Sequence, residues 1–274
     1  MAITKAIIPV AGYGVRRLPI TKSIEKCMLP IGNRPLVDYI VQDCLSAGIT
    51  DIFFVVSGKN TQLESYYSDN DQLNQYLIKN NKTEFLPLIA PPAVQFHYIV
   101  QPINEKYGTA IPVSLVMPEI KKGESVVVLT GDDFIYNSDD SSEVARLLAA
   151  TPDGGNAILA VNVAPDQVSR YGVLQIDGDN NFVQIVEKPS AENAPSTLIN
   201  ISKYVFNYDM LKKISDYSDT TVKGEYYITE PINQYVNSGG KLKVVTAAGK
   251  YLDGGSLEGW LHANNVVVGS RVLH

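Results

Sequence analysis

The sequence has few of the residues that build metal centres, disulfide frameworks or membrane spans. It contains two cysteines and three histidines, and Cys27, Cys44, His97, His262 and His274 lie too far apart for a zinc motif or a disulfide framework. No apolar run of roughly 18 residues is present, and the N-terminus lacks a charged segment followed by an apolar one. We therefore expect a soluble, cytoplasmic protein with two buried thiols and no membrane partner.

The chain also lacks the excess positive charge of nucleic-acid-binding proteins. Its formal net charge is −6, whereas such proteins carry a basic face or tail. We expect small molecules rather than nucleic acid as partners. With 274 residues, 45% of them hydrophobic, the chain is long enough to bury the core of one large α/β domain.

Short apolar runs alternate with helical segments in the first half of the chain. A segment at 34–48 has Pro35 near its start and Gly48 near its end, which is typical of a helix. This alternation predicts βαβ units and a Rossmann-like, mostly parallel mixed sheet flanked by helices. The expected strands are 6–10, 52–56, 96–100, 125–129 and 157–163.

The second half of the chain has antiparallel features. Residues 171–177 and 181–187 alternate apolar and polar side chains around a turn, which predicts a hairpin. A third strand is expected at 198–207, so a smaller antiparallel portion joins the parallel sheet. Further elements are expected as a helix near 227–237, a strand near 242–246, a closing helix at about 256–267, and a surface excursion at 70–92 with a short helix at 71–79.

The loop at 10–30 is rich in glycine and positive charge. A dinucleotide fingerprint needs a third glycine where Arg17 stands, and an ATPase-type P-loop needs a Gly-Lys-Ser/Thr sequence that is absent. The loop could instead bind an anion through its backbone N–H groups, with Arg16 and Lys26 reaching over it. A tight turn with solvated basic residues remains the alternative.

The whole stretch Gly12-x-Gly14-x-Arg16-x-Leu-Pro-x-Thr-Lys, followed by Lys26-x-Met-Leu-Pro, resembles the signature of the sugar-phosphate nucleotidyltransferases. Within that family it is most similar to the bacterial UTP–glucose-1-phosphate uridylyltransferases, and the resemblance covers nearly all of the chain. It implies one domain over 1–274, with a nucleotide-binding part at about 1–135 and a sugar-phosphate-binding part at about 136–274. It also implies that the nucleotide is held by Ala11, Gly12, Gly14, Arg16 and Lys26.

The resemblance also assigns the base. The segment at 58–69 resembles one by which uridylyltransferases differ from their thymidylyltransferase relatives, which favours UTP. Gln101 matches the glutamine that pairs with the pyrimidine, and Gly108 the glycine that lets backbone approach the base. Uracil and thymine share the imide edge that an amide can pair with. Gln101 therefore leaves dTTP open as an alternative to UTP.

Two aspartates follow predicted strands and could share a magnesium ion. Mg²⁺ favours one or two carboxylates, several waters and substrate phosphate oxygens. The family pattern assigns the metal to Asp132 and Asp253, and it also places Asp132 among the substrate-binding residues. Taken singly, each aspartate also suits a turn or a helix cap.

The Glu187-Lys188-Pro189 stretch resembles the motif that holds the sugar phosphate. There the glutamate accepts hydrogen bonds from sugar hydroxyls and the lysine binds the phosphate, while Gly172 lets backbone approach the sugar. The implied reaction is attack of glucose 1-phosphate on the α-phosphorus of UTP without a covalent enzyme intermediate. Arg16, Lys26 and Lys188 are the expected catalytic residues because they neutralise the phosphates.

Several positions depart from the family pattern. Val15 replaces a threonine, Glu25 replaces a proline and puts a negative charge near the phosphates, and Arg17 adds a second guanidinium beside Arg16. Lys106-Tyr-Gly-Thr replaces the family's Gly-Leu-Gly-His. These changes keep open a catalytically weak regulatory protein that binds a nucleotide sugar. The resemblance also implies a homo-oligomer, either a dimer or a tetramer.

Overall fold

The computed structural model describes residues 2–58, 61–103 and 106–272. Within them one central sheet contains nine strands. These strands are β1 (Lys5–Pro9), β4 (Asp51–Val56), β5 (Gln95–Val100), β6 (Ser125–Leu129), β8 (Ala157–Asn162), β9 (Gly172–Ile176), β10 (Phe182–Glu187), β11 (Leu198–Asn207) and β12 (Lys243–Thr246).

Most strands of this sheet are parallel. β1 pairs in parallel with β4 and β6, β4 with β5, and β12 with β8. β11 runs antiparallel between β6 and β8, and the antiparallel β9–β10 hairpin joins β11 where Ile199 pairs with Val173. The predicted mixed sheet with a smaller antiparallel portion is confirmed.

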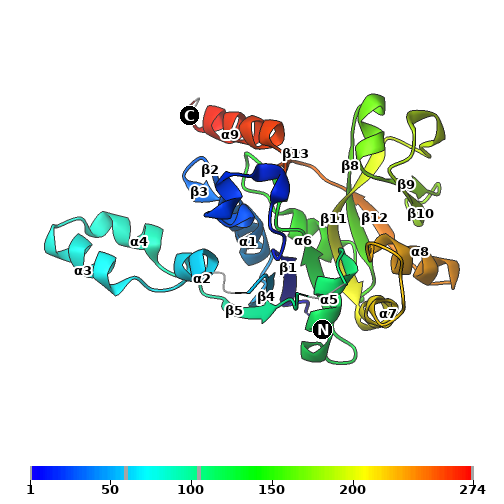
Figure 1. Cartoon of the computed structure of the whole chain (residues 1–274), viewed down its shortest axis with the longest axis horizontal. Coiled ribbons are helices and arrows are strands. Elements are labelled where there is room, and N and C mark those ends of the chain that lie inside the picture. Colours follow the sequence, from blue (N-terminus) through cyan, green and yellow to red (C-terminus); the bar gives the residue numbers. More distant parts are fainter. Residues whose placement is uncertain (1, 59–60, 104–105, 273–274) are drawn as a thin grey trace.

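Helices cover both faces of the sheet, as predicted for strands that are apolar on both sides. The helices α1 (Leu36–Ser46) and α6 (Glu143–Ala149) pack on one face, and α9 (Leu257–Val272) joins the same core through Ala263 and Val267 while it packs on β2 (Pro30–Ile31) and β13 (Lys250–Asp253). The helices α5 (Ala110–Val116), α7 (Tyr208–Ser218) and α8 (Thr229–Asn237) pack on the other, and Figure 1 shows the two layers. In β1, Ile8 faces the first layer and Ile7 the second, so successive side chains supply two separate cores.

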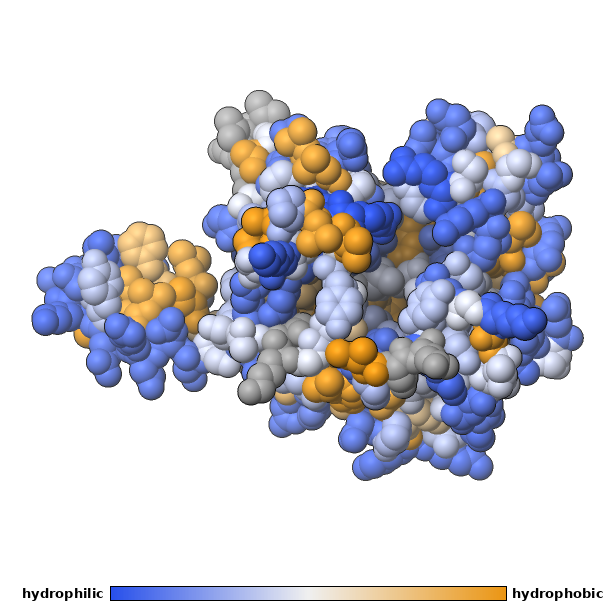
Figure 2. Space-filling model, viewed as in Figure 1, coloured by the Kyte–Doolittle hydropathy of each residue, from blue (hydrophilic) through white to orange (hydrophobic). Residues whose placement is uncertain are grey.

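A helical arm projects from the body of the molecule (Figure 1). It contains α3 (Asp71–Lys79) and α4 (Leu86–Ile89), and at its base α2 (Thr61–Tyr67) packs into the body through Leu63 and Tyr67. The Asn70 side chain accepts a hydrogen bond from the Leu73 N–H at 3.0 Å and so caps α3, which confirms the helix expected at 71–79. Figure 2 shows apolar side chains gathered on this arm, where Tyr76 and Leu88 are exposed.

Two short two-stranded sheets complete the fold, and the sequence patterns do not predict them. β2 (Pro30–Ile31) pairs with β3 (Arg34–Pro35). Because Arg34 and Pro35 belong to this strand, α1 begins at Leu36, two residues after the start of the helical segment expected at 34–48. β7 (Asp133–Tyr136) pairs antiparallel with β13 (Lys250–Asp253), which sets Asp253 opposite Asp133. This second pairing brings two distant parts of the chain to one edge of the sheet.

Across the described residues, every helix falls short of the length and apolar character needed to span a bilayer. Both cysteines are buried and unpaired, in agreement with the expectation of two buried thiols. Burial raises the pKa of the Cys27 thiol to about 12, so this side chain stays protonated near neutral pH although it lines the cavity described next.

Candidate active site

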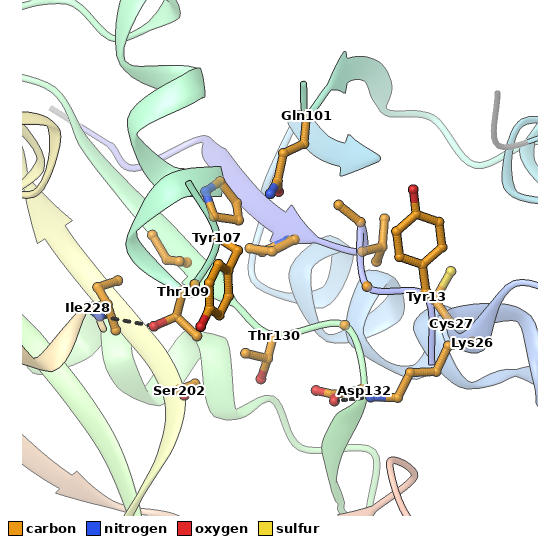
Figure 3. Close-up of a pocket in the computed structure, with 18 of the residues that line it drawn as sticks. Tyr13, Lys26, Cys27, Gln101, Tyr107, Thr109, Thr130, Asp132, Ser202 and Ile228 are labelled. Atoms are coloured by element: carbon orange, nitrogen blue, oxygen red, sulfur yellow. Dashed lines mark hydrogen bonds and ion pairs between the residues drawn. The ribbon is translucent and has the colours of Figure 1, made fainter. Parts of the chain in front are cut away.

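A cavity of about 400 Å³ opens where β1, β5 and β6 end. Its position agrees with the rule that ligands of open α/β sheets bind beyond the carboxyl ends of the strands. Figure 3 shows side chains from both halves of the chain converging on it. Among the residues expected to bind substrate, the lining includes Ala11, Gly12, Lys26, Gln101, Gly108 and Asp132.

The expected loop residues do not all reach this cavity. Gly14 has a φ of +64°, and a Cβ there would lie 2.9 Å from the Thr21 methyl carbon, so glycine lets the loop close on itself. Arg16 is exposed and does not belong to the lining. Its charge still contributes to lowering the pKa of Asp132, which places it within electrostatic reach of the site.

Arg17 does not act as a second solvent-facing guanidinium beside Arg16. It is buried, its Nη1 donates to the Ser256 carbonyl oxygen at 2.7 Å, and its guanidinium carbon lies 5.0 Å from the centre of the Trp260 ring. Its side chain therefore bonds to the segment that begins α9. The expectation that Arg17 adds a second guanidinium beside Arg16 is therefore wrong, because the side chain is buried against Ser256 and Trp260.

Glu25 also has a partner away from the cavity. Its Oε1 accepts from the Gln62 N–H at 3.0 Å, and its own N–H donates to Gln62 Oε1 at 2.8 Å. Burial raises the pKa of Glu25, and the Gln62 and Leu63 N–H groups oppose the shift. The carboxylate thus joins the loop to the start of α2.

Lys26 and Asp132 form an ion pair at the cavity wall, with 2.5 Å between Lys26 Nζ and Asp132 Oδ2 (Figure 3). Burial opposes the charge on Asp132, but the Lys26 ammonium outweighs it, and the pKa of Asp132 is lowered. Asp132 is therefore ionised at neutral pH. Only 15% of the Lys26 side chain is exposed, so its charge is poorly screened by water and acts strongly on a nearby phosphate.

Asp253 lies beside this pair. A Cβ on Gly255 would lie 3.0 Å from Asp253 Oδ1 and 3.4 Å from both Asp132 Oδ2 and Lys26 Nζ, so the two carboxylates converge on one small region. Among the described residues no group of three or more His, Cys, Asp or Glu side chains converges in this way. Two hard carboxylates suit Mg²⁺ completed by water and phosphate oxygens, so Asp132 and Asp253 could hold that ion.

A buried ion pair beneath the site was missed by the sequence analysis. Lys203 is 2% exposed, and its ammonium bonds to the Asp133 carboxylate at 2.5 Å and to the Asp133 carbonyl oxygen at 3.1 Å. The Thr130 and Tyr251 hydroxyls also donate to this carboxylate. Burial nevertheless raises the pKa of Asp133. A lysine inside the apolar run at 198–207 was the available signal.

A second cavity of about 200 Å³ adjoins the first. Gly172, Glu187 and Lys188 line it together, as the family motif implies. A Cβ on Gly172 would lie 3.2 Å from Glu187 Oε1, so the glycine makes room for this carboxylate. Tyr171, the neighbour of Gly172, also lines it, and lining residues that no sequence motif indicated include Arg170, Asn200, Tyr227, Thr229 and Tyr251. The two cavities share Thr109, Ser202 and Ile228.

Gly108 joins the cavity wall to a distant segment. A Cβ there would lie 2.5 Å from the Tyr226 nitrogen and 2.6 Å from its carbonyl oxygen. The Tyr226 N–H donates to the Tyr107 carbonyl at 2.8 Å, and the Ile228 N–H donates to Thr109 Oγ1 at 2.9 Å. Position 108 therefore requires glycine because any side chain there would collide with the backbone of Tyr226.

We expect Gly108→Ala to lower the free energy of unfolding by about 2–4 kcal/mol, because a methyl group there combines overpacking with an unfavourable φ. The matched control is Gly239→Ala, where φ is also positive but nothing lies within 4 Å of the added Cβ. Its expected cost is about 1 kcal/mol. Urea unfolding of both variants measures the difference, and equal losses would show that the contact with Tyr226 is unimportant.

A glycine-rich loop, a mostly buried lysine and two converging carboxylates at this edge of an α/β sheet form a site suited to the phosphates of a nucleotide together with a divalent cation. The family model for nucleotidyl transferases matches residues 5–268, and the chain belongs to that family.

The chain is similar to curated and solved members of this family. It is 34% identical, over 96% of its own length and 92% of the relative's, to a Methanocaldococcus jannaschii protein provisionally named UTP–glucose-1-phosphate uridylyltransferase. It is 30% identical to the Pseudomonas aeruginosa UTP–glucose-1-phosphate uridylyltransferase, over 96% and 95% of the two chains. A solved UDP-glucose pyrophosphorylase complexed with UDP-glucose matches 98% of this chain and 99% of its own, with a TM-score of 0.82 and 27% identity.

Proposed function

We propose that this protein transfers the uridylyl group of UTP to glucose 1-phosphate and releases UDP-glucose and pyrophosphate. The observation that carries the proposal is the convergence of Lys26, Asp132 and Asp253 at a cavity that adjoins a second one containing Glu187 and Lys188. The uridylyltransferase names of the relatives support the choice of substrates. UTP occupies the larger cavity and glucose 1-phosphate the smaller one.

In the proposed reaction a phosphate oxygen of glucose 1-phosphate attacks the α-phosphorus of UTP, and pyrophosphate leaves on the opposite side. The attacking phosphate is already ionised near neutral pH, so no general base is needed. The rate therefore depends on positioning and on neutralising charge. Lys26 and Arg16 neutralise the triphosphate, and Lys188 neutralises the sugar phosphate. The Gln101 amide pairs with the imide edge of uracil.

We propose that Asp132 and Asp253 hold a Mg²⁺ ion, since their carboxylates lie close to one another and to Lys26. When bound, this ion offsets negative charge on the phosphates. The chain's own contribution is to keep Asp132 ionised through Lys26 and to orient the Asp253 carboxylate through the turn after β13.

Pyrophosphate release by the purified chain tests the proposal. Glucose 1-phosphate is supplied with UTP, dTTP, ATP, CTP or GTP separately, with Mg²⁺ and with a chelator. Metal-dependent release that is fastest with UTP supports uridylyl transfer. A preference for dTTP would replace it by thymidylyl transfer, and silence with every nucleotide alongside UDP-glucose binding would indicate the catalytically weak regulatory protein.

Lys188→Ala is expected to lower kcat/KM for glucose 1-phosphate by about 10²–10³-fold, because one charge-neutralising donor is lost. The side chain is exposed, so the thermal midpoint should stay unchanged. Exposed Lys241→Ala is the control, with kinetics expected to match those of the unmodified chain. If Lys188→Ala changed only the KM for UTP, the assignment of Lys188 to the glucose 1-phosphate cavity would be contradicted.

The resemblance to the family further supports a single domain, with a nucleotide-binding part at about 1–135 and a sugar-phosphate-binding part at about 136–274. It also supports a cytoplasmic location and a homo-oligomeric assembly, either a dimer or a tetramer. Light scattering coupled to size-exclusion chromatography measures the assembly. A monomer at micromolar concentration would contradict that part of the proposal.

A further inference from the structure

Arg17 belongs to the loop at 10–30, yet its side chain bonds to the far end of the chain. Its exposed fraction is 6%. The Nη1 group donates to the Ser256 carbonyl oxygen at 2.7 Å, and the guanidinium lies over the Trp260 ring at 5.0 Å. A cation is rarely buried without compensating contacts, so this arrangement needs an explanation that a solvated basic loop does not offer.

Ser256, the residue that Arg17 contacts, also orients Asp253. The Ser256 hydroxyl donates to Asp253 Oδ2 at 2.9 Å, and the Gly255 N–H donates to Asp253 Oδ1 at 2.7 Å. Both carboxylate oxygens are therefore held by the turn at 253–256. The Ser256 carbonyl oxygen that accepts from Arg17 also accepts from the Trp260 N–H at 3.0 Å. A shift of this carbonyl would carry the whole turn with it.

Trp260 attaches the same turn to the other end of the loop. Its indole Nε1–H donates to the Pro30 carbonyl oxygen at 2.8 Å. Arg17 bonds to Ser256, the residue before α9, and Pro30 bonds to Trp260 in the first turn of α9, so two points of the loop hold the start of this helix. The segment between them contains Lys26, whose ammonium is paired with Asp132. Loop and turn are therefore joined at two points, one before and one after Lys26 in the sequence.

We propose that Arg17 is a positioning residue for Asp253: it holds the 253–256 turn against the loop so that the Asp253 carboxylate stays beside Asp132 when a divalent cation binds. The inference rests on the proposed function, in which Asp253 binds the metal. Side chains that orient metal ligands typically contribute 10- to 100-fold to metal affinity. Arg17 touches neither the reacting phosphates nor the metal, and it acts through Ser256.

Arg17→Met tests the inference because methionine keeps much of the length and the contact with Trp260 but removes the donors to Ser256. We expect it to weaken Mn²⁺ binding by about 10-fold or more, measured by the electron paramagnetic resonance signal of free Mn²⁺ with and without UTP. The Mg²⁺ concentration for half-maximal pyrophosphate release should rise by the same factor. At saturating Mg²⁺, kcat should stay within about twofold, since the proposed lysines are untouched.

Three further variants separate positioning from loss of folding or of charge. Ser256→Ala should weaken Mn²⁺ binding in the same direction, and the Arg17→Met/Ser256→Ala pair should lose less than the product of the two effects, because both act through one turn. Arg17→Lys keeps the positive charge but loses the planar guanidinium, so its Mn²⁺ affinity should lie between those of the unmodified chain and Arg17→Met. Lys241→Met removes an exposed positive charge that lines neither cavity, and it should leave Mn²⁺ binding unchanged.

Trp260 is the only tryptophan of the sequence, so its emission reports whether Arg17→Met remains folded around it. A folded Arg17→Met with unchanged Mn²⁺ affinity and unchanged Mg²⁺ dependence would overturn the inference. A wild-type chain that binds no Mn²⁺, or an equal loss of affinity in Lys241→Met, would overturn it as well. If Arg17→Met fails to fold, Arg17→Lys and Ser256→Ala decide. Absence of turnover with every nucleotide would contradict the proposed function alone, since the Mn²⁺ comparison needs no turnover.

Discussion

Lys26→Ala should lower kcat for pyrophosphate release by about 10²–10³-fold, the usual cost of removing one preorganised group that stabilises developing charge. The Lys26 side chain is mostly buried, and its ammonium bonds to Asp132 between the proposed phosphate and metal positions. Its loss removes positive charge from the transferred phosphate and leaves the Asp132 carboxylate without its counter-charge. Steady-state kinetics with UTP and glucose 1-phosphate measure the effect.

Lys26→Arg and Lys79→Ala serve as comparison variants for this prediction. Arginine keeps the charge but presents it as a planar fork, so partial activity is expected. Lys79 lies at the exposed end of α3 in the arm, and its removal should leave kcat unchanged. A Lys26→Ala variant that retains more than a tenth of wild-type kcat would contradict the proposed role.

Lys203→Met should lower the free energy of unfolding by about 3–5 kcal/mol, because removing one partner of a buried ion pair leaves the other charge uncompensated. The ammonium lies beneath β7, where it bonds to the Asp133 carboxylate and carbonyl oxygen. β7 carries Asp133 and pairs with β13, which ends at Asp253. Lys203→Met should therefore also weaken Mn²⁺ binding at the proposed metal site. Urea unfolding measures the change in stability, and Mn²⁺ titration measures the change in affinity.

Two controls separate the buried pair from a general effect of removing lysine. Lys203→Met/Asp133→Asn removes both charges. It keeps one side-chain oxygen that can accept from the Thr130 or the Tyr251 hydroxyl, while the amide NH₂ can donate to the other hydroxyl, so the variant should recover about half of the lost stability. Lys212 pairs with Asp216 on the exposed face of α7, and Lys212→Met should leave stability unchanged. Equal losses in Lys203→Met and Lys212→Met would contradict this account.

Long apolar patterns predicted the main elements well. The strands at 125–129 and 198–207 and the helix at 71–79 end at the residues expected for them. In each case the local pattern and the tertiary environment favour the same structure, since buried strands need continuous apolar runs and an amphipathic helix needs its period. The mixed sheet and its hairpin followed from the order of these elements.

Short pairings between distant segments could not be predicted in the same way. β7 and β13 have four residues each and lie more than a hundred positions apart, so neither has a pattern of its own. The same holds for the contact of Gly108 with Tyr226. Such contacts form only after the sheet has brought these distant segments together, and the spacing of residues along the chain does not indicate which segments will meet.

The amino-acid sequence alone determined the sheet-and-helix alternation, the family resemblance and the chemical types available to bind phosphate and Mg²⁺. Side-chain type and local periodicity are properties of the chain before it folds. Only the tertiary structure decided which of two adjacent arginines is exposed and which bonds to Ser256, and that Lys203 is buried against Asp133. These outcomes depend on burial and on approach between segments far apart in sequence, and both arise only when the chain is packed.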